Sequence, residues 1–410
     1  MIHSTGIGRS ARPIIRNVQK GPTIAIAPTL CAALALFSPW ANYMQIAPFI
    51  TPVTLIVALM TVYMVVRLLR SPVLSIARRD MYLLLYVILV TLSFFWALST
   101  ENWGNNIFWW YICVATYFAA RSAPRSAAHF RLLSYAFFIG MLITFLNLQL
   151  TFDEWGSSSG RYNVFDHNSN FTAYVLSGGL FLFLATWSYL GPTRAMVLLM
   201  PIWIGMTVYC QILLGTRGAL LSSGLTVCLF LFRRVIPNAG LKAIIITFSI
   251  IAFSVAVGLN NYLLLFFDSF GLGRGTGDLS NRGFIWVEAY SYILSNPVLG
   301  IGPGVFSEIS ELRAGAHNLF LTISLETGLV GMFLFGGYLF LYFLGILRES
   351  RSNREGLLLL AMFSCFWFPI VSSGHWELAP FSWLLLGFFQ RLTSIERDGA
   401  SVRIRVFADA

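Results

Sequence analysis

Long apolar runs alternate with short polar segments along most of the chain. A transmembrane α-helix needs about 20 consecutive apolar residues, and several of the runs approach that length. The shorter ones require local adjustment at the edges of the bilayer. The pattern predicts an all-α integral membrane protein with about twelve transmembrane helices, at residues 23–37, 48–66, 81–98, 106–120, 132–150, 171–189, 195–213, 218–232, 241–258, 318–346, 357–373 and 378–390.

The composition agrees with a membrane protein, because 57% of the residues are hydrophobic and only 11% are charged. In soluble domains about a quarter of the residues are charged. The five cysteines are odd in number and form no Cys-x-x-Cys pair. The sequence therefore indicates neither a disulfide framework nor a zinc site.

Positive charge predicts the orientation of the chain. The net charge is +10, and basic residues of short loops gather on the cytoplasmic side of a membrane. If the N-terminus lies in the cytoplasm and the helices alternate, most of the 27 Lys and Arg residues fall on the cytoplasmic side. The exceptions, which would lie outside, are Arg161, Arg217, Arg274, Arg282 and Arg313.

This orientation divides the chain into five parts. A cytoplasmic tail, 1–22, precedes a membrane region of about nine helices at 23–258. A periplasmic loop follows at 259–317, and its length favours a functional role. A membrane region of about three helices, 318–390, leads to a cytoplasmic tail at 391–410. The first apolar run fits either a retained helix or a cleaved signal peptide, since its flank is basic.

Several unusual residues are concentrated between Asn281 and Gly331. Ser280 and Asn281 are good N-cap types, so a helix is expected to begin at Arg282. It should end at Asn296-Pro297, because proline cannot continue a helix. A turn with little side-chain cover follows, and His317-Asn318 stands directly before a long apolar run.

The order and spacing of these residues resemble the signature of the O-antigen ligase and polymerase family. The matching residues are Arg282 with Trp286, Asn296-Pro297 with Gly300, Gly302 and Gly304, His317-Asn318, and Glu326-Thr327-Gly328-Leu329-Val330-Gly331.

Members of this family are bacterial membrane enzymes that move a glycan off a polyprenyl-diphosphate carrier. The resemblance implies a GT-C-like fold in the inner membrane, an active site that faces the periplasm, and a retained first helix. It implies an undecaprenyl-diphosphate-linked glycan as donor and the lipid A core or a growing polysaccharide as acceptor. Membrane lipids are the other expected partners, and neither nucleic acid nor a cofactor is implied.

Arg217 and Arg282 are the candidate catalytic cations. A departing diphosphate needs its charge neutralised, and the planar guanidinium pairs with two phosphate oxygens at once. Magnesium is the other chemical solution, but the outer segments contain no Asp-x-Asp motif to hold it. The alternatives are an interfacial anchor for Arg217 and a surface ion pair for Arg282.

His317 is the candidate catalytic base, because an imidazole titrates near neutral pH and accepts a proton from a sugar hydroxyl. Asn318 would orient the histidine or bind sugar. A helix cap or a buried hydrogen bond is the alternative role for His317. Glu326 is either a buried partner of this site or an ordinary hydrogen-bonded polar group.

Three further residues are candidates for substrate binding: Arg161, Asn170 and Gly302. Arg161 followed by an asparagine at the start of a membrane helix resembles a second motif of the family. Either Asn168 or Asn170 matches that asparagine, and Asn170 fits better. Gly302 belongs to the bare turn at 300–304.

The resemblance leaves the acceptor open. A ligase would use the lipid A core, and a polymerase of O-antigen or exopolysaccharide units would use a second lipid-linked glycan. A transporter of lipid-linked glycans is the alternative from another class, since about twelve helices suit many transporters.

Overall fold

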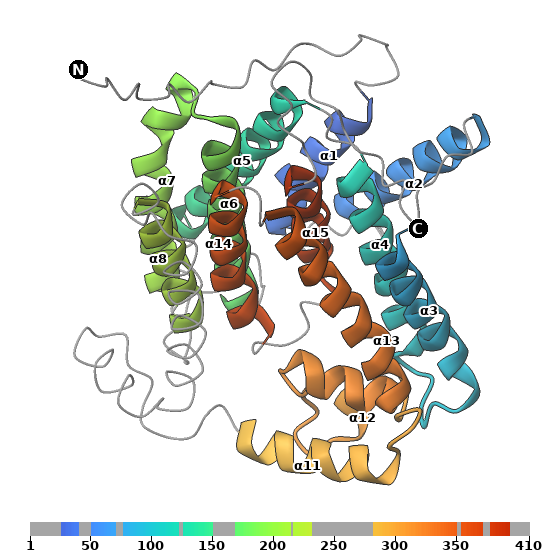
Figure 1. Cartoon of the computed structure of the whole chain (residues 1–410). Helices are drawn as coiled ribbons and strands as arrows, with labels where there is room; N and C mark the ends of the chain where they lie inside the picture. Colours follow the sequence, from blue (N-terminus) through green and yellow to red (C-terminus); the bar gives the residue numbers. More distant parts are fainter. Residues whose placement is uncertain are drawn as a thin grey trace, which may run out of the picture.

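The computed structural model describes residues 26–40, 51–70, 77–122, 126–150, 169–214, 216–231, 282–350, 354–371 and 378–393. Every regular element within these ranges is helical (Figure 1). The all-α class predicted from the sequence is therefore confirmed for the described part of the chain.

A helix lies at each predicted membrane run except 241–258, which falls outside the described residues. Within the described ranges, four helical segments are long and apolar enough to cross a membrane, namely Ala127–Leu150, Asn170–Leu190, Arg194–Leu213 and Leu319–Arg348. The count of about twelve crossings stays a prediction. The bundle consists of α1 (Ile26–Phe37), α2 (Pro52–Arg70), α3 (Arg78–Leu92), α4 (Trp103–Ser122), α5 (Ala127–Leu150), α6 (Ser169–Leu190), α7 (Arg194–Leu213), α8 (Arg217–Leu231), α13 (Leu319–Ser350), α14 (Arg354–Val371) and α15 (Pro380–Thr393).

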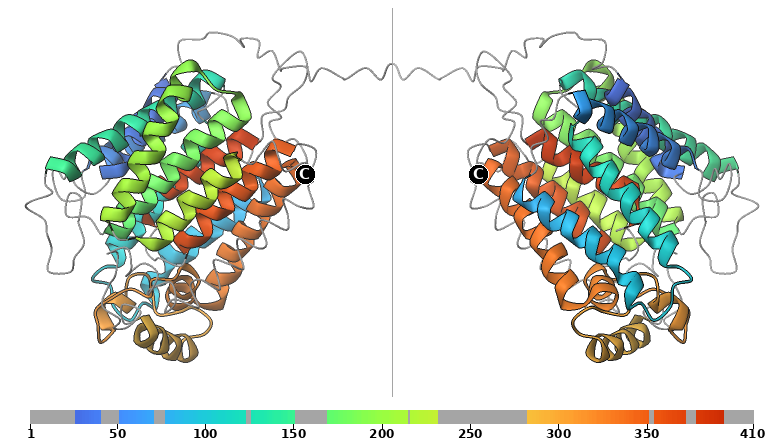
Figure 2. Two further views of the ribbon diagram at one scale, coloured as in Figure 1. Left: turned by 90° about the vertical axis from the view of Figure 1, so that its left-hand side faces the viewer. Right: turned by 90° about the vertical axis from the view of Figure 1, so that its right-hand side faces the viewer.

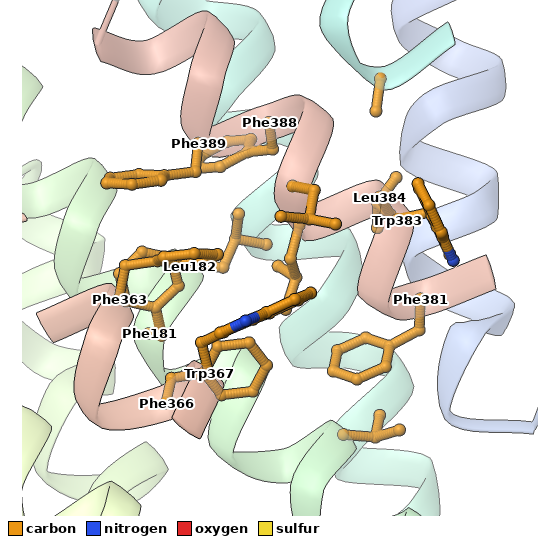
Figure 3. Packing of buried hydrophobic residues seen from close by; sticks show 14 of the residues in the cluster. Phe181, Leu182, Phe363, Phe366, Trp367, Phe381, Trp383, Leu384, Phe388 and Phe389 are labelled. Carbon is orange, nitrogen blue, oxygen red and sulfur yellow. The ribbon is translucent and has the colours of Figure 1, made fainter. Parts of the chain in front are cut away.

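Aromatic side chains of α6, α14 and α15 form the centre of the bundle (Figure 3). Residues 172–186 of α6 are buried throughout. Phe363 of α14 stacks on Phe389 of α15 with ring centroids 4.5 Å apart, and Phe181 of α6 stacks on Phe366 at 5.9 Å. Such pairs add stability beyond the burial of their apolar area. This packing fixes α6 and α15, and with them the residues at their ends.

Helix directions follow from contacts along the helices. Tyr342 Oη of α13 donates to Leu386 O of α15 at 2.8 Å, while Tyr82 near the start of α3 packs on Phe333 of α13. Phe335 of α13 packs on Trp383 of α15, so α13 and α15 are parallel. Arg79 of α3 lies against Gly345 of α13, so α3 runs antiparallel to α13. The predicted alternation has the same relative directions.

Residues 282–318 lie together at one end of the bundle, which we call the loop end (Figure 2). They contain two helices, α11 (Arg282–Ser295) and α12 (Phe306–Ile309). Both are inside the range that the sequence assigns to a periplasmic loop. The sequence places the loop end outside the cytoplasm, and this orientation stays a prediction.

A buried polar cluster ties three helices together at the opposite end. Asp80 of α3 is fully buried and forms an ion pair with Arg121 of α4. Tyr117 Oη of α4 lies 2.6 Å from Gln390 Oε1 of α15 and 3.3 Å from Asp80 Oδ1. Because a buried charge is tolerated only when it is paired, this cluster fixes the relative positions of α3, α4 and α15.

Candidate functional site

Helix α11 has the limits that its sequence predicts, since it begins at Arg282 and ends before Asn296-Pro297. Its inner face contributes Ile285 and Ala289 to a small hydrophobic cluster at the loop end. Trp286 Nε1 donates to Ala316 O at 2.9 Å. This bond fastens α11 to the residue directly before His317.

The opposite face of α11 carries an exposed apolar stripe. Phe284 is 74% exposed and Val287 is 75% exposed. Tyr290 and Leu294 continue the stripe at helical spacing, and both are exposed. A row of apolar side chains on one face is typical of a helix that lies in a membrane interface.

The turn after α11, residues 297–304, which we call the glycine turn, depends on glycine. Gly300, Gly302 and Gly304 all have positive φ angles, of 69°, 101° and 76°. Residues with a side chain seldom adopt such angles. A Cβ at Gly302 would lie 2.5 Å from the Cβ of Ala97, so the turn also packs closely against the residues that follow α3.

Helix α13 is interrupted at Gly328, where φ is 61° and ψ is −159°. The sequence shows a single apolar run here, and the interruption was not predicted from it. The glycine turn pairs with the residues on both sides of the break. Before it, Ile301 N donates to Leu325 O at 2.7 Å, and after it Leu329 N donates to Pro297 O at 2.8 Å.

Further bonds of the same kind complete the pairing. Gly302 N donates to Glu326 O at 3.1 Å, and Val330 N donates to Val298 O at 3.2 Å. Backbone groups freed by an interrupted membrane helix must find partners within the protein. The glycine turn supplies those partners, so the turn and the break form one unit.

The Glu326 side chain belongs to this unit. It is only 8% exposed, and its Oε1 accepts a hydrogen bond from Gly304 N at 2.9 Å. Of the two roles considered from the sequence, hydrogen bonding within the protein is therefore observed. The carboxylate holds the last glycine of the turn against α13.

The segment between α3 and α4 covers the same turn. Trp96 Nε1 donates to Leu299 O, and Leu98 N donates to Ile301 O, both at 3.0 Å. Asn102 N donates to Glu308 Oε1 of α12 at 2.9 Å. These partners are about two hundred residues apart in the sequence, so the loop end is assembled from two distant parts of the chain.

A cavity of about 240 Å³ lies between α4, the glycine turn and the start of α13. The contribution of α4 to this cavity was not predicted from the sequence. The one sequence feature that points to it is the group of asparagines beside Trp103. The polar residues that line it are Asn102, Asn105, Asn106, Ser307, Thr322 and Glu326.

His317 stands at the edge of this cavity, because Gly315 and Ala316 line it. The histidine is half-buried and has a positive φ of 50°. Strained backbone of this kind occurs preferentially at functional sites, although histidine tolerates it better than most residues. Asn318 caps α13, since its Oδ1 accepts from Phe320 N at 3.0 Å and from Leu321 N at 3.3 Å.

Asn170 and the start of α8 form a second group. Asn170 Oδ1 accepts a hydrogen bond from Thr216 Oγ1 at 3.0 Å, and Thr216 directly precedes Arg217, the first residue of α8. Gln211 Nε2 of α7 donates to Ser177 Oγ of α6 at 2.8 Å. The ends of α6, α7 and α8 are therefore held together by polar contacts.

The structure thus brings Gly302, His317 and Asn318 together at the loop end, and Asn170 to the start of α8. Arg161 and the side chains of Arg217 and Arg282 lie outside the described residues. The observed contacts of Gly302 are with the protein itself. Every assignment of a functional role to these residues stays a prediction.

In the part of the chain that the structure describes, no three His, Cys, Asp or Glu side chains are grouped so that they could hold a metal ion.

Comparison with known proteins gives one finding. Residues 202–336 match a family model described as O-antigen ligase. The matched range includes α8, α11, the glycine turn, His317 and the break in α13, and it excludes α4. No curated protein matches the chain.

Proposed function

We propose that this chain, whose residues 202–336 match the family model described as O-antigen ligase, is a membrane glycosyltransferase of that family. In this proposal it moves a glycan from an undecaprenyl-diphosphate carrier to an acceptor on the periplasmic face of the bacterial inner membrane. The lipid A core is the proposed acceptor. The observation that carries the proposal is the loop end, where the glycine turn is hydrogen-bonded to both sides of the break in α13 and Trp286 of α11 is bonded to Ala316, the residue directly before His317.

The proposed reaction is a displacement at the anomeric carbon of the donor sugar. A hydroxyl oxygen of the acceptor attacks this carbon, and the bond from the carbon to the diphosphate oxygen breaks. The hydroxyl proton passes to His317, and undecaprenyl diphosphate leaves. A single displacement inverts the anomeric configuration.

Arg217 and Arg282 are the proposed diphosphate ligands. Each is the first residue of a helix, α8 and α11 respectively. A helix N-terminus carries partial positive charge and favours phosphate groups. A guanidinium at this position adds two parallel hydrogen bonds to the phosphate oxygens. Such groups stabilise the negative charge that develops as the diphosphate departs.

The stripe on α11 supports a lipid-linked donor. It begins at Phe284, two residues after Arg282, and continues through Val287. Arg282 would therefore hold the diphosphate at the level of the lipid head groups while the polyprenyl chain extends along apolar surface. A soluble nucleotide-sugar donor would gain nothing from this surface.

His317 is the proposed base, and Asn318 supports its position by capping α13. Asn170 is proposed to bind substrate near the start of α8, and Arg161 is proposed as a further substrate-binding residue. The proposal needs no metal ion, because the arginines neutralise the diphosphate.

The test uses purified protein in lipid nanodiscs with an undecaprenyl-diphosphate-linked glycan as donor and the lipid A core as acceptor. We expect free undecaprenyl diphosphate and a glycan joined to the lipid A core, both with and without EDTA. A longer glycan on the carrier would identify a polymerase of repeat units instead. If the donor crosses a vesicle membrane and its diphosphate bond stays intact, the protein is a transporter and the proposal is wrong.

A further inference from the structure

The cavity beside His317 contains a buried hydroxyl that the protein does not use. Thr322 is 5% exposed, and its Oγ1 has no hydrogen-bond partner within the described ranges of the chain. Leaving a buried polar group unpaired costs about 1–3 kcal/mol. Thr322 also lines the cavity, so its hydroxyl is a candidate partner for a molecule bound there.

The rest of the lining has a distinctive chemistry. Asn102, Asn105 and Asn106 extend over little more than one turn at the start of α4, and all three line the cavity. An amide side chain both donates and accepts hydrogen bonds, and so does the hydroxyl of Thr322. The carboxylate of Glu326 only accepts when it is ionised.

This chemistry fits sugar hydroxyls better than phosphate. A hydroxyl group donates and accepts, as the amides do, and it can donate to the Glu326 carboxylate. A phosphate oxygen accepts only, and the buried carboxylate would repel its charge. Among the described residues of the lining, none is basic.

The size of the cavity sets the length of the ligand. Its volume is about 240 Å³. Pockets for drug-sized ligands are larger, at about 300–1,000 Å³. The space is therefore suited to one sugar ring rather than to an oligosaccharide.

We propose that this cavity is a subsite that binds one sugar residue of the glycan substrate through its hydroxyl groups. The proposal rests on the glycan-transfer function proposed above and extends it to α4, which lies outside the matched domain. The bound ring belongs either to the donor glycan or to the acceptor glycan, and its hydroxyl chemistry is the same in both cases.

Two variants test the subsite. Thr322→Val keeps the shape of the side chain and removes the unpaired hydroxyl. Asn105→Ala changes an exposed residue of the lining, so it leaves folding intact if Thr322→Val does not. The matched control is Thr116→Val, because the buried Thr116 hydroxyl donates to Ile112 O within α4 and lies away from the cavity.

Binding of the free glycan, released from its carrier, is measured by saturation-transfer NMR on wild type and variants in nanodiscs. We expect Thr322→Val and Asn105→Ala each to weaken binding about three- to tenfold, the scale of one hydrogen bond. Thr116→Val should bind as wild type does. In the transfer assay, a rise in KM for the donor alone or for the acceptor alone identifies the source of the ring.

Unchanged glycan binding in both variants overturns the subsite, and the transferase proposal then stands or falls by its own assay. Glycan binding that depends on Thr322 and Asn105 in a protein without transfer activity supports the subsite and removes the transferase. If inorganic pyrophosphate binds in the cavity and the glycan does not, the cavity is an anion site and the proposal is wrong.

Discussion

Replacing Gly328 with alanine should separate the glycine turn from the break in α13. At φ 61° and ψ −159°, the backbone is in a region that only glycine occupies readily. An added Cβ would also collide with Val298 O and would lie 2.6 Å from Leu299 N. Both atoms belong to the backbone of the glycine turn, so neither can rotate away as a side chain would.

The expected cost has two parts. Forcing a residue with a side chain into this backbone region costs about 1–3 kcal/mol. Moving the turn away would break the bonds from Leu329 N to Pro297 O and from Val330 N to Val298 O, each worth about 0.5–1.5 kcal/mol. We expect Gly328→Ala to lower the stability of the folded protein by about 2–6 kcal/mol.

Gly336→Ala is the matched control, because Gly336 lies in the same helix and a Cβ there meets no atom within 4 Å. In a helix interior, alanine is favoured over glycine by roughly 0.5–1 kcal/mol. Both variants are compared with wild type by thermal unfolding in detergent and by the transfer assay. If Gly328→Ala unfolds at the same temperature as Gly336→Ala and retains activity, the proposed unit of turn and break is wrong.

Three further predictions concern other parts of the molecule. Arg282→Lys keeps the charge and loses the planar fork, so donor binding should weaken by about 1.5–3 kcal/mol in a lipid-binding assay; unchanged affinity would remove Arg282 from the diphosphate site. Asp80→Asn leaves the partly buried Arg121 without its ion partner, and thermal unfolding should show a loss of about 3–5 kcal/mol; an unchanged unfolding temperature would refute that role. A reporter enzyme fused after Gly300 should be active outside the cytoplasm and one fused after Ser350 inside it, and the reverse result would invert the predicted orientation.

Much of the fold could be predicted from the sequence because a membrane helix is a local feature. The lengths of the apolar runs predict the bundle helices. The N-cap residues before Arg282 and the proline at position 297 predict the limits of α11, which the structure has at Arg282 and Ser295. These signals need no knowledge of distant contacts. The same reasoning could not show the break in α13, because a glycine in an apolar run is compatible with a straight helix.

The candidate site was only partly predictable for a related reason. His317, Asn318 and the glycine turn lie close together in the sequence and resemble a known signature. Asn102 reaches the site through a bond to Glu308 that joins residues 206 positions apart. Hydrophobic pattern and spacing contain no information on such a contact, so the cavity appears only in three dimensions.

The central claim is that His317 acts as the base in glycan transfer, and His317→Ala tests it most directly. Purified variant and wild type are compared in nanodiscs for binding of the lipid-linked donor and for turnover with acceptor. We predict that donor binding persists and that turnover falls by about 10²- to 10⁴-fold, the usual effect of losing a general base. Turnover at the wild-type rate in His317→Ala would contradict the account.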